Sequence, residues 1–154
     1  MATNILKPTD MLAVAIQLAA TGHRYQFDRT GRPYILHPLE VMHYTKSDDL
    51  EVLSIAALHD VVEDCGITYT ELRERGFSER VIDGVRCLTK IPGESEEEYK
   101  QKVKSNPDAV VVKMADLRHN SDIRRLKGVT DKDIKRTVKY HQFYLELQEW
   151  LRAN

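Results

Sequence analysis

The chain has 154 residues, of which 42% are hydrophobic and 31% are charged. This composition predicts one soluble domain that buries most of its apolar surface around a single core. The 23 lysines and arginines nearly balance the 24 aspartates and glutamates, which argues against DNA binding and leaves phosphate recognition to a local pocket. The first residues, "MATNILKPTD", lack the basic start and apolar stretch of a signal peptide, and no apolar run reaches about 18 residues, so we expect a cytoplasmic protein without a membrane partner.

Helical patterns follow one another along almost the whole chain. Thr9 or Asp10 is expected to cap the first helix, and Gly66 is expected to end the third. The run "VVVKM" has strand propensity, but a lone strand cannot satisfy its backbone, so we interpret the run as buried helix. The predicted helices are 11–20, 37–45, 50–64, 68–75, 78–89, 95–105, 109–120 and 131–151. The pattern predicts an all-α, single-domain helical bundle over residues 1–154.

The stretch "AALHDVVEDCG", Ala56–Gly66, puts two polar pairs into an apolar helix. In one continuous helix, His59–Asp60 and Glu63–Asp64 lie on adjoining parts of one face, because they are three and four residues apart. A buried carboxylate needs a partner, and a metal ion is one such partner. Imidazole and carboxylate together suit Mn²⁺, Fe²⁺, Zn²⁺ or Mg²⁺. The alternative interpretation, a hydrogen-bonded His–Asp pair without a metal, is not excluded at this point.

A second apolar helix carries another buried acid. The stretch "VVVKMADLRHN" contains Asp116, with Asn120 one turn further along the same face. One cation shared between Asp60 and Asp116 would satisfy both carboxylates. The loop-like stretch "HRYQFDRTGRPYILHP" adds Arg24 and His37 ahead of a helix. The chemistry that these residue types favour is hydrolytic.

These stretches, in this order and together with "VRCLTK", resemble the hydrolase domain of RelA/SpoT-type enzymes. The resemblance covers residues 7–150 and is far more specific than a His-Asp pair alone. It implies an HD-type helical bundle that removes the 3′-pyrophosphate from (p)ppGpp or its adenosine analogue (p)ppApp. The length of the chain resembles that of the stand-alone small alarmone hydrolases.

The resemblance also implies a role for individual side chains. The metal, which is Mn²⁺ by preference in this family, would be held by His37, His59, Asp60 and Asp116. The catalytic pair that orients and deprotonates the attacking water would be Glu63 and Asp64. The substrate contacts would be Arg24, against the nucleotide base, and Asn120, at the ribose end.

The substrate pocket departs from the family pattern. Tyr25 stands where these hydrolases often carry a basic residue, and Ile123 stands where they commonly carry a hydroxyl residue. The segment after "LTK", expected to hold the 5′-phosphates, opens with acidic residues. His119 is expected on the surface. The basic side chains that are candidates to compensate are Lys90, Lys100, Lys102, Lys104, Arg124 and Arg125.

Two other functions stay open on the sequence. One is an HD phosphohydrolase of another phosphate ester, such as a nucleoside monophosphate, NADPH or a pyrophosphorylated tRNA end. The other is a non-catalytic nucleotide-binding regulatory module, which predicts the loss of a metal ligand or of the Glu63–Asp64 pair, and neither is lost. The sequence is also compatible with a homodimer and with a small alarmone synthetase as a partner.

Overall fold

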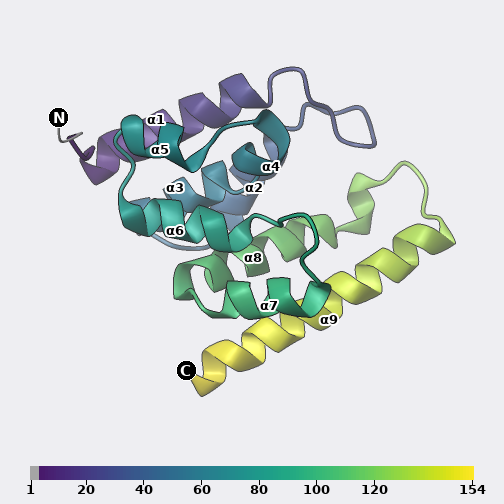
Figure 1. The fold of residues 1–154 in the computed structure, drawn as a ribbon. Coiled ribbons are helices and arrows are strands. Elements are labelled where there is room, and N and C mark those ends of the chain that lie inside the picture. The colour runs from purple at the N-terminus through teal and green to yellow at the C-terminus, as the bar shows by residue number, and fades with distance from the viewer. Residues whose placement is uncertain (1–3) are drawn as a thin grey trace.

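The computed structural model describes residues 4–154, and helices form nearly all of its regular structure (Figure 1). One isolated β-bridge joins Phe27 to Pro33 within these residues, so the all-α prediction is confirmed. No helix of the described part is long and apolar enough to cross a membrane. The helices are α1 (Pro8–Gly22), α2 (Leu36–Tyr44), α3 (Leu50–Leu58), α4 (Val61–Cys65), α5 (Tyr69–Glu74), α6 (Glu79–Leu88), α7 (Glu96–Lys104), α8 (Pro107–Asn120), the 3-10 helix η1 (Ile123–Arg125) and α9 (Asp131–Ala153).

Local sequence signals set most helix starts. Capping boxes, in which a hydroxyl residue and an acid satisfy each other's free backbone N–H groups, begin α5, α7 and α9. The expected cap of α1 by Thr9 or Asp10 is wrong, because α1 begins at Pro8 after an uncapped Lys7. Proline suits the first helical position, since its fixed φ angle is helical and its missing N–H is not needed there. The predicted end of α4 at Gly66 is confirmed, with φ at 68°.

The helix predicted over residues 50–64 is interrupted at His59 and Asp60. α3 ends at Leu58, and α4 begins at Val61 after Asp60, whose φ and ψ angles are −108° and −2°. The prediction of one continuous helix is therefore wrong. The backbone turns at the two polar residues, so they lie at a junction between helices rather than along one helical face.

The helix α3 lies at the centre of the fold and contacts α1, α2, α6 and α8. It is the most apolar segment of the chain, and its buried residues include Val52, Ile55 and Leu58. On the other side, α8 lies between α2 and the long helix α9, which runs along the lower edge of the molecule (Figure 1). The run "VVVKM" is part of α8, as predicted. This packing brings the α3–α4 junction close to α2 and α8.

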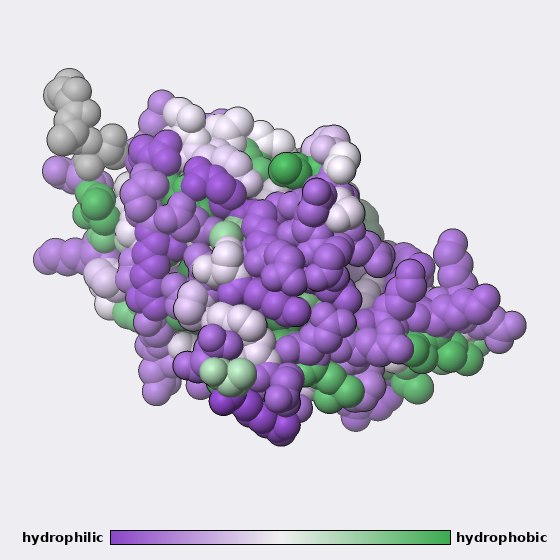
Figure 2. All heavy atoms as spheres, turned by 60° about the horizontal axis from the view of Figure 1, so that its bottom comes forward, coloured by the Kyte–Doolittle hydropathy of each residue, from purple (hydrophilic) through white to green (hydrophobic). Residues whose placement is uncertain are grey.

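The outer surface is mainly polar. The lower side of the molecule in Figure 1 is covered largely by hydrophilic side chains, with apolar ones in small groups near its edges (Figure 2). The large apolar residues are mostly collected in one core cluster that includes residues of α1, α3, α6, α8 and α9. The polar cluster described next is therefore an exception inside an apolar interior.

Candidate active site

Four ligand atoms from three places in the fold converge beneath the α3–α4 junction. Nε2 of His37, on α2, lies 2.9 Å from Oδ1 of Asp116, on α8, and 3.7 Å from Oδ2 of Asp60. Nε2 of His59 lies 3.0 Å from Oδ2 of Asp60 and 3.6 Å from Oδ1 of Asp116. Metal–ligand bonds of about 2.1 Å put neighbouring ligands of an octahedron about 3 Å apart, so His37, His59 and Asp60 are close enough to share one divalent cation, and Asp116 lies beside both histidines. The structure thus brings all four predicted metal ligands together.

The ring of His59 independently points to a cation. Its Nδ1 lies 2.7 Å from the carbonyl oxygen of Ala56, which only accepts hydrogen bonds, so Nδ1 carries a proton. Its Nε2 is buried, has no hydrogen-bond partner and faces the carboxylates of Asp60 and Asp116. Burial alone would lower the pKa of His59, but these carboxylates raise it well above the ordinary value. The lone pair of Nε2 would repel the lone pairs of these carboxylate oxygens unless a proton or a metal ion lies between them. Two imidazoles and two carboxylates form a donor set that suits a metal.

Asp116 is the most heavily supported of the four residues. It is buried, and Oδ2 accepts a hydrogen bond from Nζ of Lys113 at 2.8 Å. Oδ1 accepts one from Nδ2 of Asn120 at 2.9 Å. Burial opposes ionisation, but Lys113 and the two histidines outweigh it and hold the pKa of Asp116 well below its usual range. The carboxylate is therefore ionised and held in place beside the two histidines.

The other ligands also have neighbours that hold them. The hydroxyl of Tyr34 donates to Oδ2 of Asp60 at 2.6 Å. Nδ1 of His37 lies 2.7 Å from Nδ1 of His119. The expectation of a surface position for His119 is wrong: the residue is 8% exposed, and burial together with the nearby Arg125 lowers its pKa to about 4. The position on α8, three residues after Asp116, turns this ring inward.

The two acids after the His-Asp pair face different surroundings. Glu63 lines a cavity of about 90 Å³ together with three of the metal ligands and two lysines, and its Oε1 accepts a hydrogen bond from the backbone N–H of Lys90 at 2.6 Å. Asp64 accepts a hydrogen bond from Nε2 of Gln26 at 3.1 Å. Oε1 of Gln26 lies 2.8 Å from Nδ1 of His23. Of the pair, Glu63 is the one whose side chain faces the ligand cavity.

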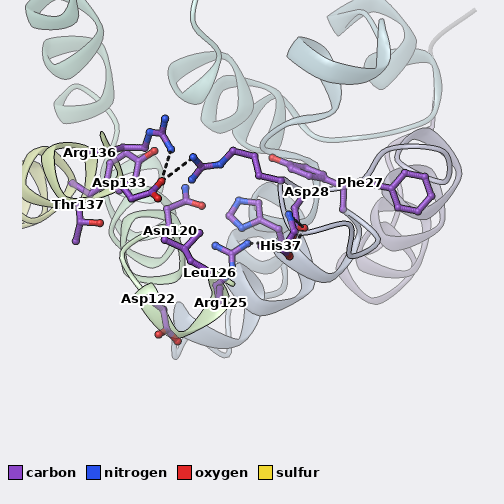
Figure 3. Close-up of a pocket in the computed structure, with 14 residues that line it drawn as sticks. Phe27, Asp28, His37, Asn120, Asp122, Arg125, Leu126, Asp133, Arg136 and Thr137 are labelled. Carbon is purple, nitrogen blue, oxygen red and sulfur yellow. Dashed lines mark hydrogen bonds and ion pairs between the residues drawn. The ribbon is translucent and has the colours of Figure 1, made fainter. Parts of the chain in front are cut away.

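A larger cavity, of about 320 Å³, opens beside His37 between the loop before α2, η1 and α9. His37 and Asn120 both line this cavity (Figure 3). Aromatic and charged side chains form the outer part, where Asp133 pairs with Arg29 at 3.1 Å and with Arg136 at 3.5 Å. A cavity of this size, with rings and paired polar groups, suits a nucleoside-sized ligand.

A third cavity, of about 420 Å³, lies between α7, α8 and α9 and is rich in basic residues. It shares Lys90 and Lys113 with the small cavity at Glu63, and Arg136 with the cavity at His37. Lys100 and Lys139 add to its positive lining. The three cavities thus adjoin one another around the cluster of predicted ligands, and basic residues outnumber the acidic Glu94 and Glu96 in the lining of the third.

The predicted substrate residues are only partly brought together. Asn120 lies in the cavity at His37, whereas the guanidinium of Arg24 lies 4.6 Å from the ring centre of the neighbouring Tyr25, and Arg24 lines none of the three cavities. Among the six candidate basic residues, Lys90, Lys100 and Arg125 line these three cavities. Five of the six have acidic partners: Lys100 and Lys104 pair with Glu146, Lys102 with Glu94, Arg124 with Asp122 and Arg125 with Asp28.

Several residues at the site escape the sequence analysis. Spacing carries a signal for some of them: Lys113 and Asp116 are three apart on one helix, and so are Tyr34 and His37 across a helix start. Arg136, on α9, is far from every motif in the sequence and reaches the site only through the packing of α8 on α9. No local pattern predicts that contact.

A helical fold in which two histidines and two aspartates converge in this way has the residue set of an HD-type metal site. The chain belongs to the HD domain family, whose pattern matches residues 15–127. A fold with the same arrangement occurs in a solved structure described as a metazoan orthologue of SpoT that hydrolyses ppGpp. The two share a TM-score of 0.67 and 26% identity, over 96% of this chain and 97% of the other.

Relatives of two lengths are similar to the chain. The guanosine-3′,5′-bis(diphosphate) 3′-pyrophosphohydrolase MESH1 of Danio rerio is 33% identical, over 94% of this chain and 86% of the relative. The guanosine-3′,5′-bis(diphosphate) 3′-pyrophosphohydrolase of Aquifex aeolicus is 36% identical, over 69% of this chain but only 16% of the relative. A probable GTP pyrophosphokinase of Mycobacterium leprae is 33% identical over 69% of this chain and 15% of the relative. The chain thus spans about a sixth of these long relatives.

Proposed function

We propose that the protein is a Mn²⁺-dependent pyrophosphohydrolase that removes the 3′-pyrophosphate from guanosine or adenosine polyphosphate alarmones. The observation that carries this proposal is the convergence of His37, His59, Asp60 and Asp116 beside a cavity that also holds Glu63 and two lysines. The similarity to MESH1 along nearly the whole chain supports the substrate class.

The proposed reaction is a hydrolysis. Water attacks the phosphorus that is attached to the ribose 3′-oxygen, the bond between them breaks, and the products are a nucleoside 5′-phosphate ester with a free 3′-hydroxyl and pyrophosphate. His37, His59, Asp60 and Asp116 would hold a divalent cation, which would supply Lewis-acid activation and neutralise phosphate charge. Glu63 accepts the proton of the attacking water, and the 3′-oxygen leaves with a proton.

Charge and shape support the placement of the substrate. The nucleoside would occupy the cavity at His37, with Asn120 at the ribose. The phosphates would meet Lys90 and Lys113 beside the cation, and the basic cavity between α7 and α9 would receive the remaining charge. We propose Asp64 as the second acid of the catalytic pair and Arg24 as a residue that turns from Tyr25 to the base when the nucleotide binds.

Manganese is proposed because two imidazoles with two carboxylates suit this ion and because the resembling hydrolases prefer it. The half-buried, free thiols of Cys65 and Cys87 support a reducing, cytoplasmic location. We further propose that the whole of residues 1–154 is one HD domain. A homodimer and a pairing with a small alarmone synthetase are testable by size-exclusion chromatography with light scattering and by co-expression.

The test is a product analysis with metal-stripped protein, with and without added Mn²⁺. The substrates are ppGpp, ppApp, NADPH and a nucleoside monophosphate, and pyrophosphate is quantified separately from orthophosphate. We expect Mn²⁺-dependent release of pyrophosphate from ppGpp or ppApp. Orthophosphate released from NADPH or the monophosphate alone would assign another phosphate ester, and bound metal with no turnover on all four would contradict the enzyme proposal.

A further inference from the structure

The ring of His119 lies outside the ligand cluster but is bonded to one of its members. Nδ1 of His119 and Nδ1 of His37 are 2.7 Å apart, the ring centres are 5.0 Å apart, and the ring planes differ by 19°. The distance between the two ring centres equals the distance between the two nitrogens plus about one ring radius for each imidazole. The two imidazoles therefore meet edge to edge in nearly one plane, which is the geometry of a straight N–H···N hydrogen bond.

One proton lies between these two nitrogens. The nitrogen that carries this proton determines whether Nε2 of His37 is free to bind a cation. Nε2 of His37 points at the ligand cluster, 2.9 Å from Oδ1 of Asp116. A neutral imidazole that binds a cation through Nε2 keeps its proton on Nδ1. His37 must then donate and His119 must accept, so His119 carries its own proton on Nε2.

The surroundings of His119 favour the accepting form. Nη1 of Arg125 donates to the backbone carbonyl of His119 at 3.1 Å, which puts a guanidinium next to the buried ring. The same hydrogen bond holds the backbone of His119 in place at the end of α8. The ring of Tyr44 lies near the imidazole, with its centre 5.9 Å away, and so limits rotation of the imidazole. A neutral, fixed His119 is a suitable acceptor for the proton of His37.

We propose that His119 is a positioning residue that fixes the ring of His37 and keeps Nε2 of that ring free to bind the divalent cation. Metal-binding histidines usually donate their second N–H to a carboxylate, a carbonyl or water. A neutral imidazole in this place holds the ring without adding negative charge beside the cation. The inference rests on the metal site of the proposed function, but it does not depend on the substrate.

The test measures Mn²⁺ binding to the full chain by isothermal titration calorimetry and Co²⁺ binding by visible absorption, both without substrate. His119→Leu keeps volume but removes the acceptor, whereas His119→Asn keeps an oxygen near the position of Nδ1. We expect about 10–100-fold weaker binding and a changed Co²⁺ spectrum for the leucine variant. The asparagine variant should stay much closer to the wild type. His141→Leu, which changes an exposed histidine of α9, is the matched control.

The outcomes separate this role from simple packing and from the proposed reaction. Unchanged affinity in His119→Leu would overturn the proposal, and so would an equal loss in both variants with an unchanged circular dichroism spectrum, because packing alone explains an equal loss. A wild-type chain that binds neither ion would overturn it as well. If the wild type binds Mn²⁺ but hydrolyses none of the four substrates, the proposed function fails while the result on His119 still stands.

Discussion

At the scale of single residues, the site is built around buried charges that satisfy one another. Asp116 receives hydrogen bonds from Lys113 and Asn120 and also lies against His37. A buried carboxylate with these partners is ionised, whereas the same group without them would be costly. The residue is thus prepared to bind a cation, and its loss has a different consequence from the loss of Glu63.

The contrast between Asp116 and Glu63 gives a paired prediction. Asp116→Ala should abolish both metal binding and hydrolysis, because it removes a ligand and leaves Lys113 as an unpaired buried charge. Glu63→Gln should bind Mn²⁺ as the wild type does but lose about 10²–10⁴-fold in kcat, the usual contribution of a general base. Calorimetry and a pyrophosphate assay check both. Full activity in Glu63→Gln would remove this residue from the mechanism.

Gln26 tests whether Asp64 contributes to catalysis. The Gln26 amide donates to Asp64 and faces His23 on its other side, so it fixes the carboxylate next to the metal ligands. Gln26→Leu should lower kcat on ppGpp by about tenfold, equivalent to about 1.4 kcal/mol, with unchanged Mn²⁺ affinity. Steady-state kinetics with saturating nucleotide measure the effect. A kcat equal to that of the wild type would show that the orientation of Asp64 is irrelevant to turnover.

At the scale of helices, the fold depends on close approaches that hold the central helix α3 in place. Gly84, on α6, faces Ile55, on α3, and a methyl group at position 84 would overlap the isoleucine side chain. The contact between the two helices therefore requires a residue without a side chain.

The substitution Gly84→Ala should destabilise the protein even though alanine is the better helix former. The expected cost of overpacking is about 1–3 kcal/mol, larger than the helix-propensity gain of about 1 kcal/mol. Thermal unfolding followed by circular dichroism measures the change. Gly128→Ala is the control, because nothing surrounds that glycine. An equal or higher Tm for Gly84→Ala would mean that α6 can shift away from α3.

Arg80 ties three helix starts together. Its guanidinium lies 2.8 Å from Asp49 at the start of α3, 3.0 Å from Glu51 and 2.8 Å from Asp108 at the start of α8. The hydrogen bond from Arg80 lowers the pKa of Asp49 in the folded protein. A lowered pKa stabilises the fold above the unfolded value of about 3.9, and this contribution is lost as the pH falls through the folded value.

Arg80→Gln should therefore lower the Tm more at neutral pH than in acid. The ion pairs are partly exposed, so we expect a fall of about 2–4 °C at pH 7, which corresponds to about 1 kcal/mol, and a clearly smaller fall near pH 3. Arg75→Gln, at an exposed arginine with no ion pair among the described residues, is the control. The same fall in Tm at both pH values would contradict an electrostatic role.

The sequence predicted the helices well but not their junctions. Apolar periodicity located α3 and α4, because that pattern is local, yet it did not predict the break at His59 and Asp60. The break depends on how α3 and α4 pack and on the polar groups of His59 and Asp60, which need to face α8. For the same reason the inward position of His119 was missed: a histidine near a helix end carries no local signal of burial.

At the scale of the whole molecule, the site lies where α2, the α3–α4 junction and α8 meet, with α9 completing the adjoining cavities. The four ligands predicted from the motifs lie together here. The cavity residues of α9 were not predicted, because α9 reaches them only through tertiary packing. The motifs thus predict the ligand cluster, while the shape of the substrate pocket follows from the arrangement of helices.

The most direct test of the account is hydrolysis of ppGpp by the Mn²⁺-loaded chain in water enriched in the heavy oxygen isotope, with both products weighed by mass spectrometry. The account predicts unlabelled GDP and pyrophosphate that carries one heavy oxygen, because water attacks phosphorus and the 3′-oxygen stays on the ribose. Label in the nucleotide, release of orthophosphate in place of pyrophosphate, or no turnover would contradict it.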